Sequence, residues 1–110
     1  MALPDPKSHR ISLDDAAAQA RRHRGGPPTR GVAGGDPHKG GLFLRAELDQ
    51  LLAQPGCAGL RFYYGRKDDG QDTLILVGVD EKGNDMENGV LLEDHFLCPP
   101  ICGTANALNS

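Results

Sequence analysis

Three cysteines and one histidine are the residues of this chain best suited to chemistry. His95, Cys98 and Cys102 form a His-x2-Cys-x3-Cys pattern near the C-terminus, and Cys57 lies at an expected helix–strand junction. Zinc prefers four tetrahedral ligands, and thiolate and imidazole groups suit it. These four residues are therefore a candidate zinc site. The pattern departs from a zinc knuckle, because three residues instead of two separate the tail cysteines and no second Cys-x-x-Cys occurs.

The same cysteines fit two other interpretations. In a thiol-redox site, Cys98 and Cys102 close a small disulfide, or Cys57 pairs with one of them. A reactive thiol needs nearby positive charge, whereas Glu93 and Asp94 lie close in sequence. In the structural interpretation, the thiols pack as small apolar groups and pin a proline-stiffened tail to the body. The sequence favours this last interpretation.

Two charged segments suggest weaker candidates for binding. The segment Asp80–Asp85 gathers carboxylates around a glycine, as a calcium loop does, but position twelve is Leu91 instead of glutamate. A hairpin turn suits it better. The segment Arg21–Arg24 is basic, but few aromatic residues lie near it to stack on bases. It therefore fits a solvated helix end better than a nucleic-acid site.

An enzymatic pocket is a further candidate, built from Arg61, Tyr63 and Tyr64 with His95. Histidine is the side chain most often used for proton transfer near neutral pH. Nothing in the spacing requires these residues to converge, and aromatic residues in strands usually pack. The chain has no Gly-x-Ser-x-Gly, His-Glu-x-x-His or dinucleotide-binding motif. The sequence therefore favours a protein that is not an enzyme.

Two helices are expected to position these residues. Residues 1–10 are expected to be a flexible N-terminus, and a helix is predicted over 11–24 with Ser12 as its N-cap. The segment 25–41 holds seven glycines and three prolines, which predicts a mobile loop. Leucines at helical spacing predict a second helix over 44–54.

Strands are expected after the second helix. Leu60, Phe62 and Tyr64 alternate with Arg61 and Tyr63, which predicts a strand over 58–65. A polar turn separates it from an apolar strand over 73–79, and the two are expected to form an antiparallel hairpin. A short third strand is expected at 90–92, followed by an irregular cysteine-containing tail over 93–110. The predicted fold is one α+β domain over residues 1–110, with two helices packed on a small antiparallel sheet of two or three strands.

Composition narrows the class of protein. The 110 residues are 38% hydrophobic and carry a formal net charge of −3. Residues 1–41 hold seven Lys/Arg against four Asp/Glu, and residues 42–110 hold five against eleven. An acidic body does not favour nucleic acid as a partner. No apolar run approaches the ~18 residues of a membrane helix, and the N-terminus does not resemble a secretory signal. A cytoplasmic location is expected.

Several short segments together resemble a set of small, uncharacterised bacterial proteins. The resemblance implies a bacterial source and a domain that stands alone, and it implies no activity, ligand or partner. It rests on Ile11–Leu13, Pro55–Cys57, the pattern across Leu60–Asp80 with Tyr63–Gly65 and Leu76–Asp80, the ending Cys98-Pro-Pro-Ile-Cys102, and Leu108–Ser110.

Two functional hypotheses follow from the sequence. The leading one is a non-enzymatic binding or accessory protein that contacts another protein, because the segment 25–41 is expected to be mobile and a small sheet leaves an exposed strand edge. Self-association through that edge or through the first helix is an equal alternative. The alternative is a small zinc-binding or thiol-redox protein that uses the C-terminal cysteines.

Overall fold

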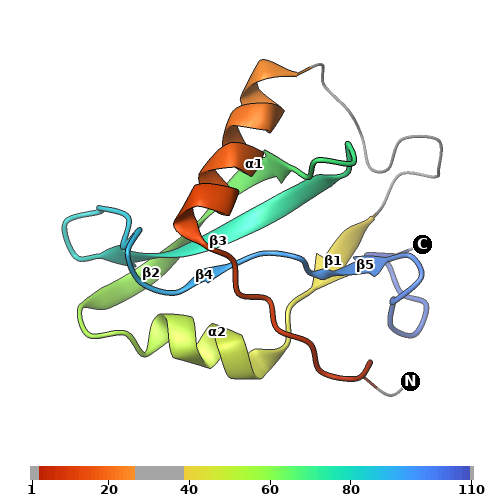
Figure 1. The fold of residues 1–110 in the computed structure, drawn as a ribbon. Helices are drawn as coiled ribbons and strands as arrows, with labels where there is room; N and C mark the ends of the chain where they lie inside the picture. Colours follow the sequence, from red (N-terminus) through yellow and green to blue (C-terminus); the bar gives the residue numbers. More distant parts are fainter. Residues whose placement is uncertain (1–2, 27–38, 110) are drawn as a thin grey trace.

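The computed structural model describes residues 3–26 and 39–109 (Figure 1). Its helices and strands confirm the predicted α+β class, with two helices and two small antiparallel sheets. Neither helix of the described segments has the length and apolar character needed to cross a membrane. The elements are α1 (Leu13–Gly25), β1 (Gly40–Leu42), α2 (Arg45–Leu52), β2 (Cys57–Arg66), β3 (Asp72–Asp80), β4 (Leu91–Leu92) and β5 (Phe96–Cys98).

The larger sheet has the strand order β2-β3-β4 and contains the predicted hairpin. Antiparallel pairing of β2 and β3 runs from Cys57 opposite Asp80 to Arg66 opposite Asp72, with an irregularity between Cys57 and Gly59. The turn places Gly70 at φ +93°, a conformation that favours glycine. The predicted short strand is present as β4, which makes β2 an edge strand.

The two helices cover opposite faces of this sheet (Figure 1). Ala16 of α1 packs with Ile75, Val77 and Leu91. On the other face, Leu51 of α2 packs with Leu76 and Leu92. Successive side chains of a strand point to opposite faces, so helices on both sides explain why β3 is apolar throughout.

Local sequence signals fix the start of α1. Ser12 is the N-cap as predicted, and its hydroxyl oxygen accepts a hydrogen bond from the backbone N–H of Asp15 at 3.1 Å. Asp14 and Asp15 occupy the first turn, while Arg22, His23 and Arg24 occupy the last. This charge order complements the helix dipole.

The second sheet differs from the sequence prediction. Residues 93–110 were expected to be irregular, but β5 pairs with β1, with Gly40 opposite Cys98 and Leu42 opposite Phe96. Backbone hydrogen bonds form this pairing, and the sequence does not predict it because glycine is depleted in strands. Gly40 and Gly41 therefore belong to a strand instead of the predicted mobile loop. Residues 27–38 of that loop lie outside the described residues.

The N-terminal segment also differs from the prediction at His9 and Arg10. The backbone of Arg10 bridges to Leu92, and the N–H of Glu93 donates to the carbonyl of His9 at 2.7 Å. His9 is 1% exposed. Its Nε2 accepts from the N–H of Leu44 at 3.2 Å, and its Nδ1 lies 3.0 Å from the carbonyl oxygen of Asp94. Satisfied hydrogen bonds explain how a polar ring is buried here.

Candidate functional site

The candidate metal ligands do not come together. Cys98 and Cys102 are joined in a disulfide, so neither sulfur is a thiolate ligand. Cys57 is a free thiol at the start of β2, where its Sγ donates to the carbonyl of Gly59 at 3.2 Å. Across residues 3–26 and 39–109, no group of three or more His, Cys, Asp or Glu side chains is arranged to hold a metal ion.

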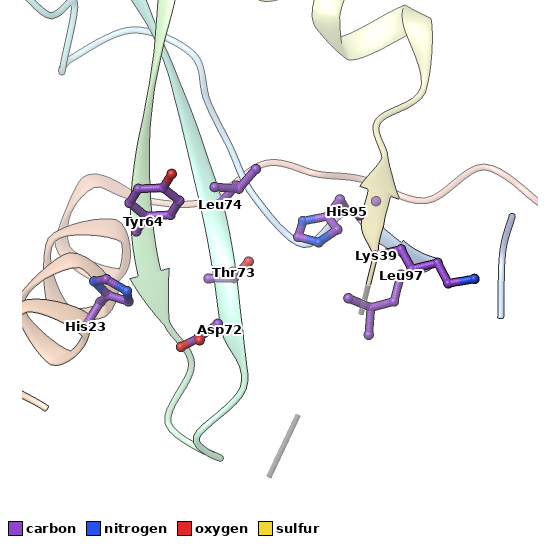
Figure 2. Close-up of a pocket in the computed structure, with 10 residues that line it drawn as sticks. His23, Lys39, Tyr64, Asp72, Thr73, Leu74, His95 and Leu97 are labelled. Carbon is purple, nitrogen blue, oxygen red and sulfur yellow. The ribbon is translucent and has the colours of Figure 1, made fainter. Parts of the chain in front are cut away.

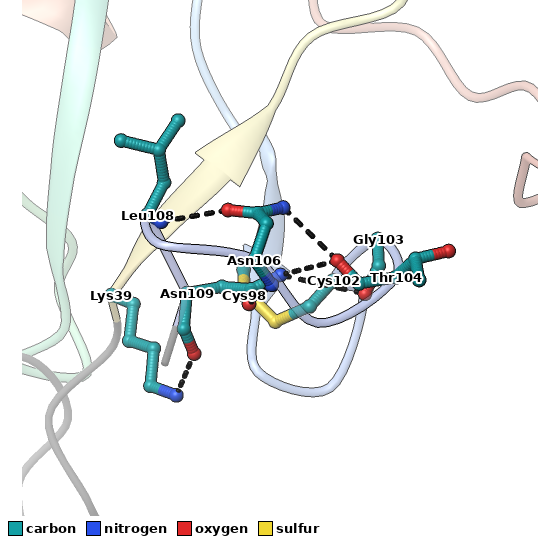
Figure 3. Close-up of a disulfide and its surroundings, with 8 residues drawn as sticks. All are labelled: Lys39, Cys98, Cys102, Gly103, Thr104, Asn106, Leu108 and Asn109. Atoms are coloured by element: carbon teal, nitrogen blue, oxygen red, sulfur yellow. Dashed lines mark hydrogen bonds between the residues drawn. A yellow bond between two sulfur atoms is a disulfide. The ribbon is translucent and has the colours of Figure 1, made fainter.

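The disulfide fastens the tail beside β1 (Figure 3). The side-chain amide of Asn109 donates to the carbonyls of Gly103 and Thr104 at 3.4 and 3.2 Å. Lys39 Nζ donates to the carbonyl of Asn109 at 2.5 Å. These contacts hold the tail near β1. The structural interpretation expected Cys98 and Cys102 to pack as free thiols, and their disulfide corrects it.

His95 lies between the two sheets. A Cβ at Gly41 would overlap its ring, so the glycine makes room for the imidazole. The Nδ1 of His95 is buried and has no hydrogen-bond partner within the described part of the chain. Burial lowers the pKa of His95 below its ordinary value. The charges of Glu93 and Asp94 act to raise it, and that of Lys67 acts to lower it.

A cavity of about 390 Å³ separates His95 from the end of the larger sheet (Figure 2). Of the residues predicted to share an enzymatic pocket with His95, only Tyr64 lines this cavity. Asp72 Oδ1 accepts from Nε of Arg66 at 2.9 Å, and the ring of His23 stacks on Tyr64 with centroids 5.6 Å apart. The carboxylate and one imidazole are therefore already engaged, and the hydroxyl of Thr73, which also lines the cavity, donates to Glu93 Oε2 at 2.7 Å.

Arg61 and Tyr63 lie on the other face of β2, where both bind Asp85. Arg61 Nη1 lies 2.5 Å from Asp85 Oδ1, and the hydroxyl of Tyr63 donates to Asp85 Oδ2. The hydrogen bond to Asp85 raises the pKa of Tyr63 above its ordinary value. Arg61 and Tyr63 are thus both bound to Asp85 of the same chain.

The remaining face of β2 carries an exposed row of apolar side chains, which we call the apolar row: Leu60, Phe62 and Tyr64. They are 42%, 53% and 61% exposed. The eight residues of α2 span about 12 Å, whereas the ten residues of β2 span about 33 Å. Helix α2 is therefore too short to cover this face completely.

The backbone of the apolar row points away from the sheet. In an antiparallel ladder, alternate residues direct their N–H and C=O groups to opposite sides. The carbonyl of Gly78 in β3 accepts from Met86 at 2.8 Å, on the side away from β2. Even-numbered residues of β3 therefore bond away from β2, and odd-numbered ones such as Ile75 and Val77 bond to it.

The register then decides which residues of β2 bond outward. Ile75 and Val77 lie opposite Tyr63 and Arg61, so these two residues make the ladder bonds. The alternate residues, which form the apolar row, direct their backbone groups to the open edge. The carbonyl of Arg66 follows the same alternation and accepts from Arg22 Nη1 at 2.5 Å.

No protein-family model, curated protein or solved structure matches the chain.

Sequence reasoning found the alternation in β2 but not its exposure. Aromatic residues in a strand usually pack, and nothing in residues 58–65 shows which face is covered. The signal that bears on exposure is elsewhere, in the short run between Leu44 and Pro55 that limits the length of α2.

Proposed function

We propose that this protein is a non-enzymatic binding protein that takes up an extended strand of a partner protein at the open edge of β2. One observation carries the proposal: the residues of the apolar row present exposed side chains and outward-pointing backbone groups together. An added strand needs both features, since backbone bonds give affinity and alternate side-chain contacts give specificity.

The two faces of β2 differ in what they offer to the side chains of an added strand. Arg61 and Tyr63 are held by Asp85 on the α1 side of the sheet. On the α2 side, the apolar row continues onto Leu76, which is buried under α2. A strand added at the edge would extend this apolar face with its own alternate side chains.

A variant in the centre of the row tests the proposal. Phe62→Lys places a charge where the incoming strand would pack, and partial exposure of Phe62 lets the fold tolerate it. Leu108→Lys is the matched control, because Leu108 is 93% exposed and lies in the tail. Pull-down with tagged protein, read by mass spectrometry, should retain partners with wild type and the control and lose them with Phe62→Lys. Identical partner sets for all three proteins would contradict the proposal.

A second candidate is thiol–disulfide exchange at the tail, which the disulfide itself favours. A thiolate of a dithiol substrate would attack one sulfur of Cys98–Cys102 and release the other as a thiolate. The second thiol of the substrate would then attack the substrate sulfur of this mixed disulfide and release the remaining tail cysteine. The substrate is left as a disulfide and the tail as two thiols. Equilibration of the protein with oxidised and reduced dithiothreitol tests this. A tail disulfide that exchanges while the protein stays folded would support the candidate, and one that reacts only after the protein unfolds would contradict it.

A further inference from the structure

We propose that the strand taken up at the β2 edge is β2 of a second copy of this chain, antiparallel, with Phe62 opposite Phe62. This inference rests on the proposed function and names its partner. It would join two three-stranded sheets into one continuous sheet across a two-fold axis.

The open part of the edge has defined limits. At one end, Arg22 Nη1 binds the outward carbonyl of Arg66, so α1 occupies the edge there. At the other end, the register irregularity between Cys57 and Gly59 interrupts regular pairing. With respect to residues 3–26 and 39–109, the stretch of edge that lacks a backbone partner therefore runs over residues 59–65, with Phe62 at its centre. The ring of His23 stacks on the Tyr64 side chain and leaves the backbone of that residue open.

Self-pairing about Phe62 is complementary in side chains. It places Leu60 opposite Tyr64 and Phe62 opposite itself, so every member of the apolar row gains an apolar neighbour on the same face. On the other face it places Arg61 opposite Tyr63, and cation–aromatic contacts are favourable. No like charges face each other within residues 59–65.

Other two-fold registers that use the outward groups are less favourable. An axis at Arg61 places that residue opposite itself, and like charges directly opposite are destabilising. An axis at Tyr63 requires Leu60 to pair with Arg66, whose carbonyl already accepts from Arg22. The two ends of the open edge and the position of Arg61 thus select the axis at Phe62.

A charge exchange at position 62 tests the register. Phe62→Lys and Phe62→Glu should each weaken self-association about 100-fold or more, because each places like charges opposite one another. Mixed in equal amounts, the two variants should form a dimer that contains one chain of each kind. Sedimentation velocity over a concentration series measures association, and native mass spectrometry identifies the mixed dimer. Circular dichroism confirms that both variants fold.

Leu108→Lys and Leu108→Glu provide the matched control, since neither should change self-association. A wild-type chain that is monomeric at about 1 mM, a dimer insensitive to both Phe62 variants, or a mixture that does not associate would each overturn the inference. A monomeric wild type with partners lost on Phe62→Lys would overturn the second copy and keep the proposed function. A monomeric wild type whose partners are retained by Phe62→Lys would overturn both this inference and the proposed function.

Discussion

Phe62 and Leu76 lie directly opposite each other in the β2–β3 ladder, yet Leu76 is 7% exposed and Phe62 is 53% exposed. Their side chains share one face of the sheet, because directly opposite residues of a ladder do so. The difference arises from α2, which packs Leu51 over Leu76 and whose eight residues are too short to cover the whole length of β2. The boundary between core and surface therefore passes between these two residues.

Alanine substitutions at Leu76 and Phe62 should lower the free energy of unfolding by different amounts. Leu76→Ala removes methyl groups from a closed core and should lower the free energy of unfolding by about 3 kcal/mol. Phe62→Ala should lower it by less than about 1 kcal/mol at low protein concentration, since little of the side chain is buried there. Urea unfolding measures both changes. Equal losses would show that the apolar row is part of the folding core.

Much of the fold could be predicted because its signals are local. The Ser12 cap and the leucine spacing predict the two helices to within a few residues, and alternation with a polar turn predicts the hairpin. The β1–β5 sheet could not be predicted, because it joins Gly40 to Cys98 through backbone groups alone. The burial of His9 was missed for a related reason, since its partners Leu44 and Asp94 are distant in sequence.

The candidate site was predicted less well than the fold. The sequence left open whether Cys57, Cys98 and Cys102 bind metal, pair or only pack, because connectivity depends on distances that spacing does not fix. The exposure of Phe62 depends on how far α2 extends over a neighbouring strand. Such a property belongs to the packing of two elements, and neither element shows it alone.

His95 should make the fold less stable as the solution becomes acidic. Burial lowers its folded-state pKa below the ordinary value, against opposing effects of Glu93 and Asp94. Between the folded pKa and the unfolded value of about 6.5, the unfolded chain binds a proton that the folded chain does not. Stability is therefore fully present above about pH 6.5 and falls as the pH drops toward the folded pKa.

The contribution of His95 is measured by urea unfolding at about pH 7.5 and pH 5.5. His95→Gln, which cannot titrate, should show a smaller difference between the two conditions than wild type. An NMR titration of the His95 ring protons checks the direction of the pKa independently. A ring that titrates above the ordinary histidine value would contradict the prediction.

The tail disulfide should contribute to stability while leaving Cys57 as a free thiol. A thiol assay on native protein without reductant should titrate Cys57 alone among the three cysteines. Replacing Cys98 and Cys102 by serine should lower the free energy of unfolding by about 2 kcal/mol, since the bond closes a short loop of the unfolded chain. Reductant should lower the stability of wild type to the same value and have no effect on the double variant.

Cys57→Ser is the control for this experiment. Its stability should remain sensitive to reductant, because the tail disulfide is intact. If reductant no longer affects this variant, Cys57 and not the tail pair forms the bond in solution.

Backbone amides of β2 should exchange with solvent in alternation when the protein is dilute. The amides of Arg61 and Tyr63 bond to β3 and should exchange slowly, whereas those of Leu60 and Phe62 point to the open edge and should exchange fast. Hydrogen exchange followed residue by residue by NMR measures this. At high protein concentration the second copy should bond to Leu60 and Phe62, so their exchange should slow while that of Arg61 changes little. Slow exchange at all four positions in dilute protein would mean that the edge is already covered by the same chain, and no added strand would have room to pair.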